Sequence, residues 1–478
     1  MSSYKDEAQT SKAPSNSSQQ PNILNIKSMA VNQLMRYTSD VLEPLSFSQS
    51  ECVFRLQPRG FLHPNSAISI GFEANATLNQ AFPYIFTGIH SLVRRAVLRT
   101  TSGKVISDTD SWNSLEGLKS CFVQNSINKE REQFLSGRQA DYELVYDIGS
   151  DVKSTHGYGL SNGYEYCHSA IGGDRTGLST NPELRLERDP EFQLKLHNLF
   201  EYCKQGNQIP LGFLDEQIEV VLYWDFTDLK SRLCLPASLA GSIAEPISIQ
   251  RSKCKFIANY TSYEGAIMER FQEEYEKGLT FAYTDYLLSK QSVNQAGYVK
   301  NVRNVGGQGL IVDSVVYGLA LDTKNATSLT GKFNSQCGSA LGGAGNPARN
   351  LLTSNLFLNS EFLYPQFVSN PARQFHSLKE AESQVPFIPR AIFSGQGQDG
   401  LIATATGEFE GRVQRTELLG QQFYHGYRLK GLASRVDNRG IDIHNAMAIA
   451  DTNHMQQCWI EVRKYVMIRD RNIEVYNI

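Results

Sequence analysis

No stretch of the sequence approaches the roughly 20 consecutive apolar residues that a helix needs to cross a bilayer. The segment 1–22, MSSYKDEAQTSKAPSNSSQQPN, is polar and lacks the hydrophobic core of a signal peptide. We therefore expect the chain to fold in the cytosol or nucleus. We also expect about the first 20 residues to form a disordered arm.

Patterns that bind metals or catalyse reactions are also lacking. Nine histidines form no His-x-x-x-His or His-Glu-x-x-His pattern, and Cys167-His168 has no second ligand pair nearby. No two of the eight cysteines have Cys-x-x-Cys spacing, so we interpret them as free, mostly buried thiols. The sequence predicts no metal and no cofactor. The cysteines are Cys52, Cys121, Cys167, Cys203, Cys234, Cys254, Cys337 and Cys458.

No dinucleotide site, P-loop or nucleophile elbow is predicted. The Gly-x-Gly-x-x-Gly match at 395–400 precedes LIATATGEFEG, which alternates like a strand, whereas a dinucleotide site needs a helix there. We therefore expect no enzyme, although a hidden carboxylate pair for glycoside hydrolysis stays open. The net charge of −3 argues against a dominant basic surface for nucleic acid, and a local basic patch remains open.

The sequence is rich in short β-type runs that Gly, Pro, Asn or Asp interrupt. Their spread over both halves predicts mainly antiparallel sheets. The runs are 52–58, 67–74, 92–99, 192–200, 218–226, 254–263, 309–322, 400–411, 427–436, 459–470 and 472–478. Helices are expected near 111–122, 128–137, 270–278 and 372–382.

The two halves resemble each other in plan. Each has strands, a long polar Gly-rich stretch (149–183 or 330–350), a helix-like insert and more strands. Since 478 residues are too many for one ordinary core, two similar β-domains in tandem are the simplest interpretation.

The segment 89–112, IHSLVRRAVLRTTSGKVISDTDSW, predicts a hairpin followed by a helix. Strand alternation puts Leu92, Arg94, Ala96 and Leu98 on one face, and Val93, Arg95, Val97 and Arg99 on the other. Gly103 suits the turn, and Asp110 or Ser111 could cap a helix that carries Trp112.

Three segments resemble the major capsid proteins of polinton-like viruses and virophages. The first lies at 88–112, the second is QIPLGFLDEQIEVVLYWDF at 208–226, and the third is the ending YVMIRDRNIEVYNI. In the first segment the matching residues are Gly88, His90, Ser91, Leu92, Arg94, Arg95, Gly103, Asp108, Asp110 and Trp112.

The resemblance implies an all-β fold of two tandem eight-stranded antiparallel jelly rolls with short helices in loops. We expect a flexible arm and lead-in at 1–44, a first roll at 45–270 and a second at 271–478. Residues Trp112, Leu115, Leu118, Ile218, Val220 and Leu222 should be largely buried.

The implied function is that of a major capsid protein of a DNA virus, located in the virion and assembled in host cytoplasm or nucleus. Homotrimers would form pseudo-hexagonal capsomers of an icosahedral shell, with minor capsid and penton proteins as partners. No membrane span and no specific nucleic-acid binding are expected.

Two alternatives remain. The acidic step here reads Ser-Asp-Thr-Asp-Ser-Trp-Asn, whereas the family more often has Glu followed by Tyr-Asn, and the middle of the second half matches no motif. A minor capsid paralogue is therefore open. A carbohydrate-binding β-sandwich protein, with Tyr158, Tyr164 and Tyr166 stacking on sugars, is the other.

The residues selected for a structural or interface role are charged or aromatic. We expect the arginines to pair with Asp108, Asp110 or other carboxylates, within the subunit or across an interface, rather than bind phosphate. The candidates are Arg94, Arg95, Arg99, Asp108, Asp110 and Trp112, and no catalytic residue is predicted.

Overall fold

The structure is a computed structural model of the 478-residue chain. It describes residues 35–72, 82–83, 88–116, 135–136, 191–226, 233–234, 248–293, 299–321, 351–368, 371–382, 425–429, 435–447 and 454–477. Predictions for the arm, for both long Gly-rich stretches, for the 400–411 run and for most of the 128–137 helix lie outside these residues.

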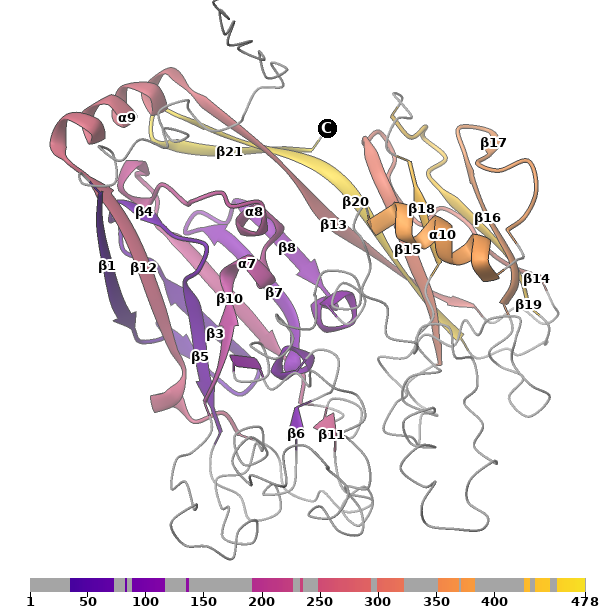
Figure 1. Ribbon diagram of the computed structural model, residues 1–478, viewed down its shortest axis with the longest axis horizontal. Helices are drawn as coiled ribbons and strands as arrows, with labels where there is room; N and C mark the ends of the chain where they lie inside the picture. The colour runs from indigo at the N-terminus through magenta and orange to yellow at the C-terminus, as the bar shows by residue number, and fades with distance from the viewer. Residues whose placement is uncertain are drawn as a thin grey trace, which may run out of the picture.

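Two antiparallel sheets face each other in the N-terminal half (Figure 1). One sheet has the order β1 (Met35–Leu42), β12 (Lys255–Tyr263), β5 (Ala67–Gly71) and β9 (Glu191–Lys195), with β4 (Phe61–Leu62) also paired to β12. The other has the order β2 (Ser46–Phe47), β3 (Glu51–Arg55), β10 (Ile218–Trp224), β7 (Val93–Thr100) and β8 (Val105–Asp110). The short strands β6 (Phe82–Pro83) and β11 (Leu233–Cys234) pair separately.

The C-terminal half has a second pair of sheets. One has the order β13 (Leu279–Val293), β20 (His454–Arg469), β15 (Val312–Leu321) and β18 (His425–Arg428), with β21 (Asn472–Asn477) also paired to β20. The other has the order β14 (Val299–Val302), β19 (Asp442–Met447), β16 (Leu351–Leu358) and β17 (Glu361–Phe362).

The strand order is the same in both halves when the additional strands β2, β4, β6, β11 and β21 are set aside. The first remaining strand of each half then pairs with the last (β1 with β12, β13 with β20), and the second pairs with the last but one (β3 with β10, β14 with β19). This nested pairing folds a chain into the two facing sheets of a jelly roll. The prediction of two tandem jelly rolls is confirmed, while the count of eight strands in each roll remains a prediction.

Alternating apolar residues turn one face of several strands towards a core. In β10 the inward side chains of Ile218, Val220 and Leu222 are fully buried, as the sequence predicted. Trp112 and Leu115 are buried as well, and Leu118 lies outside the described residues. Trp112 belongs to the core of the first roll, whereas Leu115 packs in the core of the second.

The β13–β20 pair joins the two cores. Its 15 paired positions make one long ribbon that crosses from one roll to the other (Figure 1). Phe281 and Tyr283 on β13 pack in the first core, and Tyr286 packs in the second. Side chains from the segment 271–478 therefore complete the core of the first roll.

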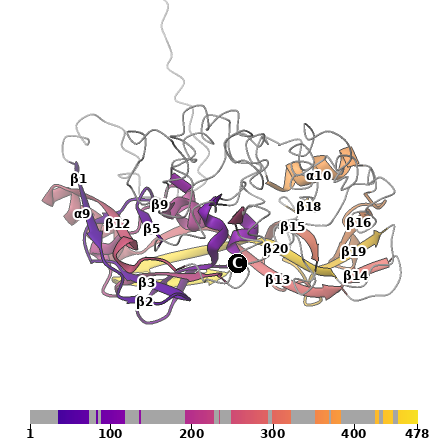
Figure 2. The ribbon, with the colours of Figure 1, turned by 90° about the horizontal axis from the view of Figure 1, so that it is seen from below.

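Few helices accompany the sheets in the described part of the chain: α7 (Leu196–Leu199), α8 (Glu201–Lys204), α9 (Gly265–Lys277) and α10 (Pro371–Glu382). The predicted helices at 270–278 and 372–382 are α9 and α10, and Trp112–Glu116 is helical within the predicted 111–122. Phe271 and Tyr275, one turn apart on α9, seal the end of the first roll against Phe61 and Phe213. Figure 2 shows α10 over the second roll, on the face away from β14.

Two sequence expectations differ from the structure. The run 192–200 was read as one strand, but the strand ends at Lys195 and the chain continues into α7 and α8. Residues 35–42 were assigned to the arm and lead-in, yet they form β1, which pairs along its whole length with β12. Backbone pairing with β12 gives these residues a partner that their local sequence does not reveal.

Candidate functional site

The β7–β8 hairpin carries the predicted structural residues. Its turn is made by Gly103, whose φ of 92° is in the region that glycine favours, and the Gly103 N–H donates to the Thr100 carbonyl. The hairpin and its turn were predicted correctly. The simple alternation was wrong at Arg94, because the pairing with β10 shifts by one residue between Tyr223 and Trp224. Arg94 is consequently exposed rather than on the face of Ala96 and Leu98.

Arg95 and Asp108 form a two-point ion pair across the hairpin. The Arg95 Nε and Nη2 atoms donate to the two Asp108 carboxylate oxygens at 2.7 and 2.5 Å. This pair holds the pKa of Arg95 above its usual range. The Arg95 side chain is still 41% exposed, so the pair lies at the surface and stabilises the fold modestly.

Arg99 finds its carboxylate on a different strand. Glu219 on β10 accepts from Arg99 on one oxygen, at 3.1 Å, and from Arg55 of β3 on the other, at 2.9 Å. The Glu219 side chain is 8% exposed, whereas both arginines are more than a third exposed. This cluster ties together three neighbouring strands, β3, β10 and β7.

Asp110 and Trp112 mark the end of the hairpin. The Asp110 carboxylate accepts from the Ser111 backbone N–H at 2.8 Å and pairs with Lys290 of β13 at 3.6 Å. Trp112 is buried against His90, with ring centroids 4.9 Å apart. Arg94 lies over the ring of Tyr223 at 5.9 Å. Of the three arginines, two thus have a carboxylate partner in the subunit and Arg94 has an aromatic one.

A buried charge pair lies where β8 meets β13. Asp285 is fully buried, and its carboxylate accepts from Lys464 of β20 at 2.6 Å and from the Ser107 hydroxyl of β8 at 3.3 Å. Burial raises the pKa of Asp285, and the Lys464 ammonium opposes that shift. The Tyr283 hydroxyl donates to the Ile106 carbonyl nearby. The two rolls are therefore joined by hydrogen bonds as well as by packing.

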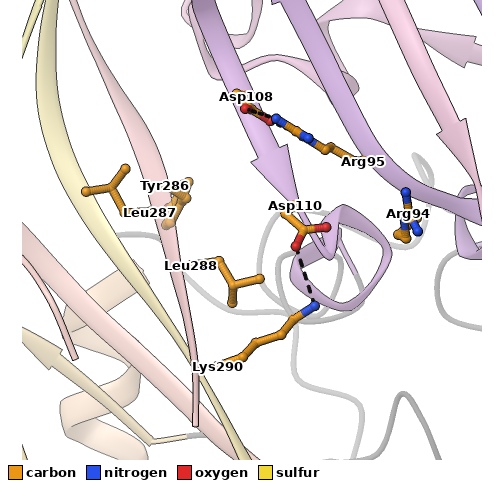
Figure 3. A pocket seen from close by; sticks show the side chains of 8 residues that line it. All are labelled: Arg94, Arg95, Asp108, Asp110, Tyr286, Leu287, Leu288 and Lys290. Carbon is orange, nitrogen blue, oxygen red and sulfur yellow. Dashed lines mark hydrogen bonds and ion pairs between the residues drawn. The ribbon is translucent and has the colours of Figure 1, made fainter. Parts of the chain in front are cut away.

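An open groove of about 540 Å³ runs beside this junction (Figure 3). Arg94, Arg95, Asp108 and Asp110 line it from the first roll, and the second roll contributes Tyr286, Leu287, Leu288 and Lys290. Lys290 reaches across it to Asp110. Each aspartate in the groove is thus already paired with a cation of the same chain.

Two further features are absent from the described residues. No group of three or more His, Cys, Asp or Glu side chains among them could hold a metal ion. Within the same part of the chain, none of the helices has both the length and the apolar character that crossing a bilayer requires.

Solved structures share this fold along nearly the whole chain. A chain of the Sputnik virophage structure has a TM-score of 0.54 and 10% identity, with 92% of this chain and 88% of that one covered. The mavirus major capsid protein has a TM-score of 0.50 and 11% identity, with 92% and 90% covered. VP54 of PBCV-1, fitted into a reconstruction of Sputnik, has a TM-score of 0.53 and 9% identity, with 93% and 97% covered.

The fold is the double jelly roll of viral capsid proteins. No protein-family model matches the chain, and no curated protein matches it in sequence. The fold that the sequence resemblance implied is confirmed by structure alone, because identities of 9–11% carry little information beyond fold. The double jelly roll also explains why the charged residues form structural pairs between strands and between rolls.

Sequence reasoning missed Glu219, Asp285 and Lys464. Glu219 was visible only as one polar position in an apolar strand, IEVVLYW, and its partner Arg99 is 120 residues away. Asp285 and Lys464 are 179 residues apart, on strands whose pairing follows from the whole topology. The one local signal was Lys464, a charged residue at an inward position of the β-type run 459–470.

Proposed function

We propose that this chain is a structural, non-enzymatic capsid protein of the major capsid type. In this proposal three copies form a pseudo-hexagonal capsomer, and capsomers tile an icosahedral shell. The observation that carries it is the repeated strand order, which gives each chain two similar lobes. Three such chains around one axis present six similar lobes. The mavirus major capsid protein, which shares this fold, supports the capsid role.

The exposed apolar side chains support a ring of chains. On β1 and just after it, Tyr37 is 52% exposed, Val41 60% and Leu45 53%. At the opposite end of the molecule, Val299 on β14 is 57% exposed and Phe362 on β17 is 45% exposed. Figure 1 and Figure 2 both place β1 and β14 at opposite ends of the longest axis.

Different apolar surfaces at the two ends suit a head-to-tail contact. In such a contact, one surface of a chain binds a different surface of the next copy. The copies close into a ring when the rotation between neighbours divides a full turn evenly. The contact would also cover the edge of β1 that pairs with no other described strand and so could offer backbone groups to another chain. We therefore propose that the first-roll end of one chain contacts the second-roll end of the next.

Sedimentation of the full chain tests the assembly. The wild type is expected at three times 53.5 kDa. Val41→Asp at the first end and Phe362→Asp at the second should each prevent ring closure. Tyr476→Asp, an equally exposed aromatic position (47%) on β21, is the matched control and should leave trimers intact.

Mixing the two end variants makes the test sharper. A Val41→Asp chain keeps its second end and a Phe362→Asp chain keeps its first end, so the mixture should form a heterodimer with one intact junction. A stable wild-type monomer at micromolar concentration, or trimers that survive both substitutions, would contradict the head-to-tail proposal. Contacts with minor capsid and penton proteins, location in the virion and assembly in host cytoplasm or nucleus belong to the same proposal.

A further inference from the structure

Two buried thiols meet between the sheets of the first roll. Cys52 is on β3, and Cys254 immediately precedes β12 in the opposite sheet. Their Sγ atoms are 3.5 Å apart, and both side chains are fully buried in one apolar core. A disulfide has an S–S distance of about 2.05 Å, so closing the bond needs a combined sulfur movement of about 1.5 Å.

Two hydrogen bonds connect the chain just before one cysteine to the chain just before the other. Gln49, in the exposed turn before β3, donates from Nε2 to the Ile249 carbonyl at 3.2 Å and accepts the Ile249 N–H at 3.0 Å. We call these two hydrogen bonds the Gln49 clasp. The exposed residues Arg251 and Ser252 form a 3₁₀ turn just before Cys254. Gln49 and Ile249 precede Cys52 and Cys254 by only three and five residues, so we expect opening of the clasp to admit solvent to the thiols without unfolding the roll.

We propose that Cys52 and Cys254 are an oxidation-dependent pair that forms a disulfide between the two sheets of the first roll. The proposal does not depend on the capsid role. The disulfide would join positions 202 residues apart in the chain, which strongly restricts the conformations of the unfolded state.

A peroxide is the oxidant. One cysteine thiolate attacks a peroxide oxygen, the O–O bond breaks, and a sulfenic acid forms as water leaves with the thiol proton. The second thiol then attacks the sulfenic sulfur, the S–S bond forms, and the S–O bond breaks to release a second water. The two cysteines lose two electrons, and hydrogen peroxide is reduced to two waters.

The closed structure keeps the thiols unreactive. The neighbouring Cys254 and burial both raise the pKa of Cys52, so its reactive thiolate is scarce while the clasp is shut. The rate of disulfide formation should therefore follow the opening of the Gln49 clasp. Losing its two hydrogen bonds in Gln49→Ala should accelerate the reaction about threefold to tenfold.

Hydrogen peroxide treatment of the full-length native protein tests the proposal. After quenching with N-ethylmaleimide and digestion, mass spectrometry should find a cross-linked peptide that contains Cys52 and Cys254 and that dithiothreitol separates. The buried thiols Cys203 and Cys458 provide controls, because the cross-link should persist in Cys203→Ser and Cys458→Ser. The disulfide should also raise the unfolding temperature of the protein, and dithiothreitol should reverse that increase.

A matched variant isolates the clasp. Gln291→Ala removes two similar hydrogen bonds from a glutamine on β13, to the carbonyls of Arg303 and Asn304, and should leave the rate unchanged. The proposal is overturned if Cys52 and Cys254 stay alkylatable, reach sulfinic acid separately, or pair with other cysteines. An equal rate in Gln49→Ala and the wild type would overturn the route through the clasp.

Discussion

The two carboxylates that bind arginines of β7 differ in their exposure to solvent and in their number of arginine partners. Asp108 and Glu219 both bind arginines of β7, but the Asp108 side chain is 26% exposed and has one arginine partner. Glu219 is 8% exposed and separates two arginines. The cost of removing each negative charge should therefore differ.

Glu219→Gln and Asp108→Asn make this comparison with matched chemistry. We expect Glu219→Gln to lower the free energy of unfolding by about 1.5–3 kcal/mol, because two half-buried arginines lose their shared anion. Asp108→Asn should cost at most about 1 kcal/mol. Urea unfolding at a fixed protein concentration measures both, since association adds to apparent stability. Equal losses would contradict the assigned roles.

His425 is a buried histidine that makes the stability of the fold depend on pH. It is buried on β18, stacked on Tyr317 with centroids 5.3 Å apart, and its Nδ1 is 3.3 Å from the Ser354 hydroxyl. Burial lowers the pKa of His425 to about 3. Below the unfolded pKa of about 6.5, the unfolded chain binds a proton that the folded chain does not, so stability falls as the pH falls.

His425→Phe should remove this contribution. Between pH 7.5 and 5.5 the wild type should lose about 1.4 kcal/mol more unfolding free energy than the variant. Leu378→Ala, in the buried face of α10 beside β18, is a non-ionisable control. Relative to the wild type, this variant should lose the same amount of unfolding free energy at both pH values. Parallel pH curves for the wild type and His425→Phe would contradict the buried neutral histidine.

At the scale of elements, the β13–β20 ribbon is the part that unites the rolls. Its inward charge pair, Asp285 and Lys464, occupies the crossing point between the two apolar cores. Removing one partner of a buried pair leaves the other uncompensated, whereas replacing both can be nearly neutral.

A double-mutant cycle tests that role. Asp285→Asn alone should cost about 3–5 kcal/mol of unfolding free energy, because Lys464 remains buried without its anion. Adding Lys464→Met should recover most of the loss, which denaturant unfolding can measure. Simply additive losses in the double variant would show that the two side chains do not act as a pair.

Sequence alone revealed the elements whose signals are local. The β7–β8 hairpin, the inward face of β10 and helix α9, with Gly278 after its last turn, were all readable. Strand β13 was missed because Asp285 and Lys290 interrupt its apolar alternation. The first turn of α7 was missed because FQLKLHNLF alternates as well as any strand does.

The interactions between elements were beyond local reasoning. That arginines on β7 would pair with carboxylates was expected, but the choice of Glu219 depends on β10 lying between β3 and β7. Arg94 left its expected face because one irregular pairing shifts the register. Both facts depend on partners more than 100 residues away, which no single-strand pattern encodes.

For the whole molecule, two like lobes and two unlike apolar ends are the features that matter. The strand order makes the lobes similar, and the exposed side chains at β1 and at β14 and β17 make the two ends different from each other. These features together favour a closed ring of chains over a two-fold dimer.

Negative-stain electron microscopy of the purified full-length chain tests this account most directly. We expect particles of hexagonal outline, with six lobes around a three-fold axis and two lobes from each chain. Two-lobed monomers, or dimers with two-fold symmetry, would contradict the proposed capsomer.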